Sequence, residues 1–185
     1  MLSNIKVKIN NCLSESYNFF VKNLIIGLLI CPTCKAKGRL EIHGYYPRHV
    51  VALIDTNLVH EILMILRLKC KSCGCTHAVL PDFIIPYCTY SYSLILECLN
   101  GYYSKVKIEE LCKRFKISPQ LIYLWIKRFL DHKAQCILLF KEKKESKVSL
   151  IEILKRILGY INLSDFLKEY FYENKYCFMQ IINSS

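Results

Sequence analysis

The sequence has no run of about 20 apolar residues, the length that a membrane-spanning helix needs. Its most membrane-like segment extends only from Asn23 to Cys31 and directly follows Lys22. A secretory signal is also a poor fit, because several polar residues precede this segment and no small-residue cleavage site follows it. A lipoprotein signal is disfavoured by the large Ile30 just before Cys31. We therefore expect a soluble, cytoplasmic protein that does not insert into a membrane.

Acidic residues are scarce relative to basic ones. The 185-residue chain has 15 Asp and Glu against 26 Lys and Arg, which gives a formal net charge of +11 and a pI near 9.1. An excess of this size predicts an anionic partner, with nucleic acid as the first candidate and a membrane surface as the second. The hydrophobic content of 53% excludes disorder as a class, and the length suits one ordinary domain or two small ones.

Cysteine is abundant, but its pattern argues against a disulfide framework. The total of eleven is odd, and outside two close pairs the cysteines are scattered singly along the chain. This usage fits a reducing compartment. Several of the single cysteines stand at positions expected inside helices, where a free thiol behaves as a small hydrophobic side chain.

The two close pairs are Cys31 with Cys34 and Cys70 with Cys73. Two residues between cysteines allow one tight turn to aim both sulfur atoms at a common point, so two such turns predict a four-thiolate Zn²⁺ site with a structural role. Cys75 is an open alternative to Cys73 as the fourth ligand. His43 and His77 are nearby, but we expect them to be packed or hydrogen-bonded side chains, because the four cysteines already complete a tetrahedral set.

The segment between the cysteine pairs has a residue pattern typical of short strands and turns. We expect strands over residues 39–43, 50–54 and 59–69, with Gly44 and Pro47 between the first two. Before them, apolar spacing predicts a helix over residues 14–26. The predicted fold class is α+β, with an N-terminal helix or arm (residues 1–30), a small β zinc ribbon (31–88), an all-α helix-turn-helix domain (89–140) and a C-terminal helical hairpin (141–185).

The helix-turn-helix prediction rests on residues 105–140, which follow a helix expected over residues 91–102. A short helix would bury a stripe at helical spacing, and Lys116 with Ile117 would form the turn. Ser118 is then a good N-cap and Pro119 suits the first helical position. The stripe of the first helix consists of Ile108, Leu111, Cys112 and Phe115, and the next helix would bury Ile122, Trp125 and Phe129.

Two stretches resemble a known family. The run from Cys70 to Pro81, with Thr76-His-Ala-Val-Leu-Pro81 as its most specific part, resembles the zinc ribbon that precedes a helix-turn-helix in insertion-sequence transposases and in small bacterial proteins of unknown function. The run from Glu110 to Ser118 is similar to the helix-turn-helix of the same transposases. Lys116 stands where that family often has glycine, which implies a left-handed backbone at a cost of about 1 kcal/mol.

These features together predict double-stranded DNA as the partner. Gln120 is placed to read a base, and the basic residues nearby are placed to hold phosphates. From Lys105 to Lys133 there are eight Lys and Arg against three acids, a local charge of +5. The expected DNA-contacting residues are Lys113, Arg114, Lys116, Ser118, Gln120, Tyr123, Lys127 and Arg128.

We expect no enzymatic activity and no small-molecule substrate. A transposase of the acidic-triad type needs three metal-binding carboxylates on a strand-rich fold, and this chain offers only four aspartates and no such strand series. A regulator, a remnant of an element and a subunit of a split transposase all remain open, as does a homodimer. The alternative functions are a protein-interaction adaptor, favoured by the apolar Leu121 and Leu124, and a thiol redox protein.

The C-terminal part is expected to close a core or a dimer interface. Residues 141–147 form a charged linker, and Ser149 with Glu152 forms a capping box, with Val148 and Ile153 as a hydrophobic staple. A last helix is expected over residues 165–174 with Ser164 as its cap. The predicted buried stripe is Leu150, Ile153, Leu154, Ile157 and Leu158, followed by the aromatic residues Tyr160, Phe166, Tyr170, Phe171 and Tyr172.

Overall fold

The computed structural model describes residues 2–5, 12–140, 149–159, 163–174 and 177–180. The protein is α+β, and its chain divides into two compact units, Met1–Ile84 and Ile85–Ser185. In the described residues the sheet belongs to the first unit, whereas the second unit is helical. None of the helices in these residues combines the length and apolar character that crossing a membrane requires.

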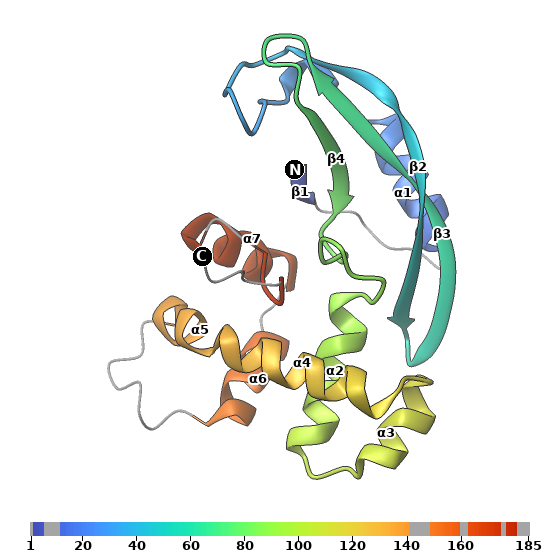
Figure 1. Ribbon diagram of the computed structural model, residues 1–185, viewed down its shortest axis with the longest axis vertical. Coiled ribbons are helices and arrows are strands. Elements are labelled where there is room, and N and C mark those ends of the chain that lie inside the picture. Colours follow the sequence, from blue (N-terminus) through green and yellow to red (C-terminus); the bar gives the residue numbers. More distant parts are fainter. Residues whose placement is uncertain (1, 6–11, 141–148, 160–162, 175–176, 181–185) are drawn as a thin grey trace. The chain divides into compact units, whose positions relative to one another are not determined.

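The first unit is built on a four-stranded sheet with the order β1-β4-β3-β2 (Figure 1). Strands β2 (Leu40–Ile54), β3 (Asn57–Cys70) and β4 (Thr76–Pro81) are antiparallel neighbours, and β1 (Leu2–Ile5) pairs with β4 in parallel. Helix α1 (Leu13–Lys22) contacts β3, and the short 3-10 helix η1 (Ile26–Leu28) contacts β2. Strand β3 ends at Cys70 and β4 begins at Thr76, so the second cysteine pair lies at the connection between them.

The strand predicted over residues 59–69 agrees closely with β3, whereas β2 is one long strand in place of the two short strands predicted at residues 39–43 and 50–54. The predicted break at Gly44 and Pro47 is wrong, because β2 continues through both residues with a β-bulge between Ile42 and Gly44. Pro47 is tolerated because β2 is an edge strand, where a missing N–H need not cost a ladder hydrogen bond. The reversal occurs instead at Asp55 and Thr56, which both have positive φ, as a tight two-residue hairpin turn requires.

Helix α1 closes the core of the first unit. The helix ends at Lys22, earlier than the predicted residue 26, and the side chain of Asn23 donates to the carbonyl oxygen of Phe19 at its end (2.7 Å). At its start, the Glu61 carboxylate accepts from the backbone N–H groups of Leu13 and Ser14 (3.0 and 2.8 Å). The core beneath it comprises Leu13, Tyr17, Val50, Ala52, Leu63, Ile65, Leu80, Phe83 and Ile84.

The second unit contains α2 (Tyr92–Tyr103), α3 (Ile108–Phe115), α4 (Pro119–Asp131), α5 (Lys133–Leu139), α6 (Leu150–Gly159) and α7 (Leu163–Asn174). Helix α2 contacts α3, α4 and α6, and α7 contacts α5 and α6. Gly101 permits the close approach of α2 and α3, because a Cβ there would lie 2.7 Å from the Leu111 side chain. The aromatic core comprises Tyr92, Trp125, Phe129, Phe166, Tyr170 and Phe178.

Most helix positions in the second unit agree with the sequence, and three details differ. The helix predicted to continue to Phe140 is divided at His132 into α4 and α5. Helix α7 begins at Leu163, before the predicted cap position 164, and Leu158 is exposed although it was expected in the buried stripe. Ser149 does accept from the Glu152 N–H (3.2 Å), as predicted. The predicted linker, Val148 and Tyr160 lie outside the described residues.

Candidate metal centre and helical pair

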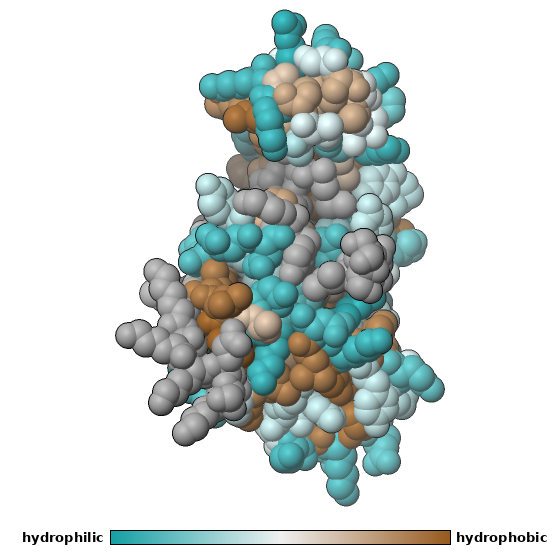
Figure 2. Space-filling model, turned by 60° about the vertical axis from the view of Figure 1, so that its left-hand side comes forward, coloured by the Kyte–Doolittle hydropathy of each residue, from teal (hydrophilic) through white to brown (hydrophobic). Residues whose placement is uncertain are grey.

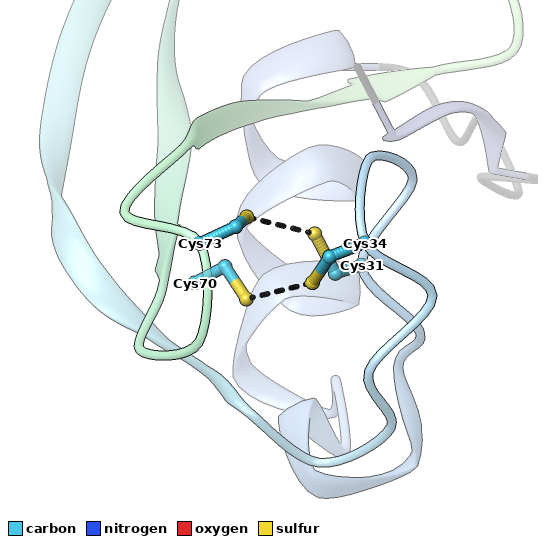
Figure 3. Close-up of side chains that lie close together, drawn as sticks. All are labelled: Cys31, Cys34, Cys70 and Cys73. Carbon is cyan, nitrogen blue, oxygen red and sulfur yellow. Dashed lines mark hydrogen bonds between the residues drawn. The ribbon is translucent and has the colours of Figure 1, made fainter.

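Four cysteine side chains from the two close pairs converge on one point in the first unit. Cys31 and Cys34 lie between η1 and β2, and Cys70 and Cys73 lie where β3 turns toward β4 (Figure 3). The four sulfur atoms all lie within 4.8 Å of one another. The Cys31 and Cys73 sulfur atoms are 3.7 Å apart, and those of Cys34 and Cys70 are 3.6 Å apart, so these are free thiols and not disulfides. This cluster can hold a metal ion.

The two cysteine turns have the same backbone hydrogen bonds. In the first, the Cys31 N–H donates to the Ala36 carbonyl oxygen and the Lys35 N–H donates to the Cys31 carbonyl oxygen, both at 3.0 Å. In the second, the Cys70 N–H donates to the Cys75 carbonyl oxygen (2.9 Å) and the Gly74 N–H donates to the Cys70 carbonyl oxygen (2.8 Å). Each turn also has a residue with positive φ at the same place, Lys35 at 62° and Gly74 at 72°.

This equivalence decides the role of Cys75 in the geometry. Cys75 occupies the place of Ala36, and the backbone N–H of each hydrogen-bonds the sulfur of the second cysteine of its turn, Cys73 and Cys34 respectively. The converging set is Cys31, Cys34, Cys70 and Cys73, and Cys75 is not a member. The residue two positions after each pair, Ala36 or Cys75, therefore supports the turn through its backbone.

The pKa values of the clustered thiols are shifted in opposite directions. Hydrogen bonds from backbone N–H groups, that of Cys34 above all, lower the pKa of Cys31 to about 5, and the N–H of Cys73 acts in the same direction on Cys70. Against the lowering effect of the Cys75 N–H, burial and the neighbouring sulfur atoms raise the pKa of Cys73 to about 12. The thiols thus resist ionising together by themselves, and a bound dication would hold all four as thiolates.

In the second unit, α3 and α4 are joined by a tight turn. Lys116 adopts the left-handed conformation (φ 52°, ψ 46°), as predicted, and the Ile117 N–H donates to the Cys112 carbonyl oxygen (3.2 Å). Ser118 caps α4 by accepting from the Leu121 N–H at 3.4 Å, and Pro119 is the first residue of α4. The predicted face of α4 is buried, with Ile122, Trp125 and Phe129 all fully enclosed. In α3 only Leu111 and Phe115 of the predicted stripe are fully buried.

The residues selected from the sequence for DNA contact differ in their surroundings. Arg114 is exposed, pairs with Glu97 at 3.1 Å and lies over the Phe115 ring. Arg128 is half-buried, and among the described residues its Nε has no hydrogen-bond partner. The remaining six are exposed around the turn and along the outer face of α4: Lys113, Lys116, Ser118, Gln120, Tyr123 and Lys127.

Three buried polar residues have partners that the sequence did not identify, although His77 was expected to be packed or hydrogen-bonded. The Tyr17 hydroxyl donates to the Val79 carbonyl oxygen (2.8 Å) and accepts from the Leu66 N–H (3.0 Å), so it bridges β3 and β4. His77 Nε2 lies 3.4 Å from the Cys31 sulfur. His132, between α4 and α5, contacts the Tyr170 hydroxyl and donates through Nε2 to the Gln180 carbonyl oxygen. Each joins segments 38 to 62 residues apart, so no local pattern could signal them.

Comparison with known proteins identifies one segment of the chain. Residues 31–115 match the family model of a domain of unknown function, DUF6431. The matched segment begins at the first cysteine of the cluster and ends at the last residue of α3, so it includes both cysteine turns. No curated protein and no solved structure matched the chain.

Proposed function

We propose that this protein is a zinc-stabilised, sequence-specific DNA-binding protein in which α3 and α4 form a helix-turn-helix and the first unit is a zinc ribbon. In this proposal it is related to the end-recognition part of a transposase and has no catalytic role. The partner is double-stranded DNA, and α4 is the helix that enters the major groove.

The choice of zinc rests on the ligand set. Four thiolates in tetrahedral reach of one another suit Zn²⁺, and a complete set leaves no open position for a substrate. Cys31 and Cys70 are fully buried, which also favours a structural role. A redox role is less favoured, because both pairs lie in turns beside strands, whereas a reactive cysteine of this kind usually stands at the start of an α-helix.

The observation that carries the DNA proposal is the division of α4 into two faces. One face is fixed in the core by Ile122, Trp125 and Phe129, so the helix has a defined orientation. The opposite face presents Gln120 and Tyr123 to solvent from the N-terminal half of the helix, and Lys127 from further along it. In a helix-turn-helix the N-terminal residues of the second helix are the ones that reach base edges. Lys113 and Lys116 are exposed at the turn, where phosphates would pass.

The test is selection of bound sequences from a random pool of DNA duplexes, using full-length zinc-loaded protein. We expect an enriched motif, and an affinity for it that falls steeply as salt rises, because each phosphate contact releases counterions. A motif made of two inverted half-sites would indicate a homodimer. Failure to bind any duplex at low salt would refute the DNA proposal.

A second candidate function is a protein-interaction adaptor, and exposed apolar side chains favour it. Tyr123, Leu124 and Leu130 of α4 are 56%, 41% and 45% exposed. Figure 2 shows hydrophobic residues among hydrophilic ones on the face of the helical unit that it draws. Binding through such a surface would depend weakly on salt, whereas DNA binding would depend on it strongly. The salt titration therefore separates the two functions.

A further inference from the structure

His77, a titratable side chain that is not a member of the cysteine cluster, is in contact with it. His77 lies on β4, where it pairs with Leu68 of β3, and only 4% of its surface is exposed. Its Nε2 lies 3.4 Å from the sulfur of Cys31, which is itself fully buried. A buried polar ring held beside a buried sulfur is a defined interaction and not a chance surface contact.

The direction of this hydrogen bond follows from the state of the sulfur. A metal-bound cysteine is a thiolate and has no proton to donate, so only the histidine can be the donor. The Nε2 atom must then carry the proton. Backbone N–H groups of Cys34 and Thr33 also approach the Cys31 sulfur, so His77 adds a side-chain donor to two backbone donors.

We propose that His77 is a positioning residue of the metal centre, which donates its Nε2–H to the Cys31 thiolate without binding the metal. The inference rests on the proposed metal binding. Four thiolates around one dication carry more negative than positive charge, and Cys31 is enclosed away from water. A hydrogen-bond donor beside such a sulfur disperses this charge and holds the ligand in position, as partners of metal ligands commonly do.

The contrast with a ligand role is geometric. The four sulfur atoms already lie in mutual reach and form a complete tetrahedral set, so His77 is left outside it. Removal of His77 should therefore weaken metal binding without changing the number of sulfur ligands. Loss of a ligand would change both the affinity for the metal and the set of atoms that bind it.

The test compares His77→Leu with His60→Leu in the full-length chain. His60 is exposed on β3 and serves as the matched control. Cobalt(II) is used as the probe, because its sulfur charge-transfer and d–d absorption bands report how many thiolates bind it. We expect the wild-type spectrum in both variants, with affinity reduced about 10–100-fold in His77→Leu, measured against a competing chelator, and unchanged in His60→Leu. Unchanged affinity in His77→Leu, or bands showing an altered ligand set, would overturn the proposal.

A second measurement needs no variant, so it answers the question even if His77→Leu does not fold. In wild-type protein loaded with cadmium-113 and labelled with nitrogen-15, the His77 ring should carry its proton on Nε2. A scalar coupling between that proton and the metal would have to pass through the Cys31 sulfur, and we expect to observe it. A ring protonated only on Nδ1 would refute the donor role. If wild-type protein binds neither cobalt nor cadmium, the proposal of a metal site fails. If the metal binds and His77 has no effect on it, only the role of His77 fails.

Discussion

Tyr17 shows how one residue can hold two strands together. Its ring lies in the core between α1 and the sheet. Its hydroxyl accepts from the Leu66 N–H and donates to the Val79 carbonyl oxygen. The pairing of β3 with β4 ends at Arg67 and Ala78. Leu66 and Val79 are the next residues on the two strands, so the Tyr17 hydroxyl continues the connection where the strand pairing stops. Burial raises the pKa of Tyr17 to about 12, so the hydroxyl remains protonated and can donate at any physiological pH.

Replacement of Tyr17 by Phe should therefore destabilise the first unit. The change leaves two buried backbone groups without a partner, at about 1–3 kcal/mol for each. Urea unfolding of metal-loaded protein, followed by far-UV circular dichroism, measures the loss. Tyr45→Phe is the control, because Tyr45 is half exposed on β2. Equal stability of the two variants would show that the bridging hydroxyl contributes nothing.

The assignment of the fourth ligand can be tested at the same scale. Cys73→Ser should lose the metal, because its sulfur is one of the four that converge. Cys75→Ser should retain it, because the carbonyl oxygen and N–H of Cys75 support the turn and are unchanged by the substitution. Metal content after gel filtration distinguishes the variants. Retention in Cys73→Ser with loss in Cys75→Ser would reverse the assignment.

His132 predicts a pH dependence for the second unit. Burial lowers the pKa of His132 below its ordinary value of 6.5, and the groups that act on it include Asp131, Arg128, Tyr170 and Gln180. The unfolded chain then binds a proton that the folded chain resists, so the stability present above about pH 6.5 is lost as the pH falls toward the folded-state pKa.

Trp125 is the single tryptophan of the chain, so its fluorescence measures this unfolding directly. We expect wild-type protein to unfold at a lower urea concentration at pH 5.5 than at pH 7.5. His132→Gln should lose much of this pH dependence, although it should also be less stable overall. The same pH dependence in both proteins would assign the effect to another group.

At the scale of elements, α4 combines a locally encoded start with an orientation imposed by the core. Ser118, Pro119 and the left-handed Lys116 are local signals that place the beginning of the helix. The outward direction of Gln120 and Lys127 is a consequence of burying Ile122, Trp125 and Phe129. Sequence periodicity was sufficient to predict both, because a helix that buries one stripe must expose the other.

The two exposed residues should have different effects on DNA binding. Lys127→Ala should weaken binding to all duplexes and reduce the salt slope by about one phosphate contact, a change of about 0.9 in log K against log salt. Gln120→Ala should instead relax the sequence preference. Fluorescence anisotropy over a salt series measures both.

Lys155→Ala is the matched control, since Lys155 is an exposed lysine of α6. An equal effect of Lys155→Ala and Lys127→Ala would mean that general charge, and not α4, determines binding. Arg128 is less suitable for this test because it is half-buried, so its removal would change packing as well as charge.

At the scale of the whole molecule, the two units have separate cores. The first contains the cysteine cluster and the residues beneath α1, and the second contains the aromatic cluster around Phe178. A structural zinc site contributes about 10–16 kcal/mol of apparent binding free energy. A small strand-rich unit has little else to replace it.

Metal removal should therefore unfold the first unit and leave the second folded. A strong chelator should reduce the strand signal in far-UV circular dichroism, while Trp125 keeps the emission of a buried indole because it lies in the second unit. Return of zinc should restore the signal. A simultaneous red shift of tryptophan emission would show that the second unit also depends on the metal.

Features that depend on neighbours a few residues apart could be predicted from the amino-acid pattern. These are the cysteine spacing of each turn, the capping of α4 and α6, and the buried face of α4, since spacing and local hydrogen bonds act within one or two turns of chain. The tertiary structure was needed to show that β2 continues through Gly44 and Pro47, and that Cys75, left open as an alternative to the predicted Cys73, lies outside the cluster. It also decided the placement of Tyr17, His77 and His132. Each of these depends on groups brought together from distant segments, and strand register or side-chain partners at that range leave no periodic trace in the sequence.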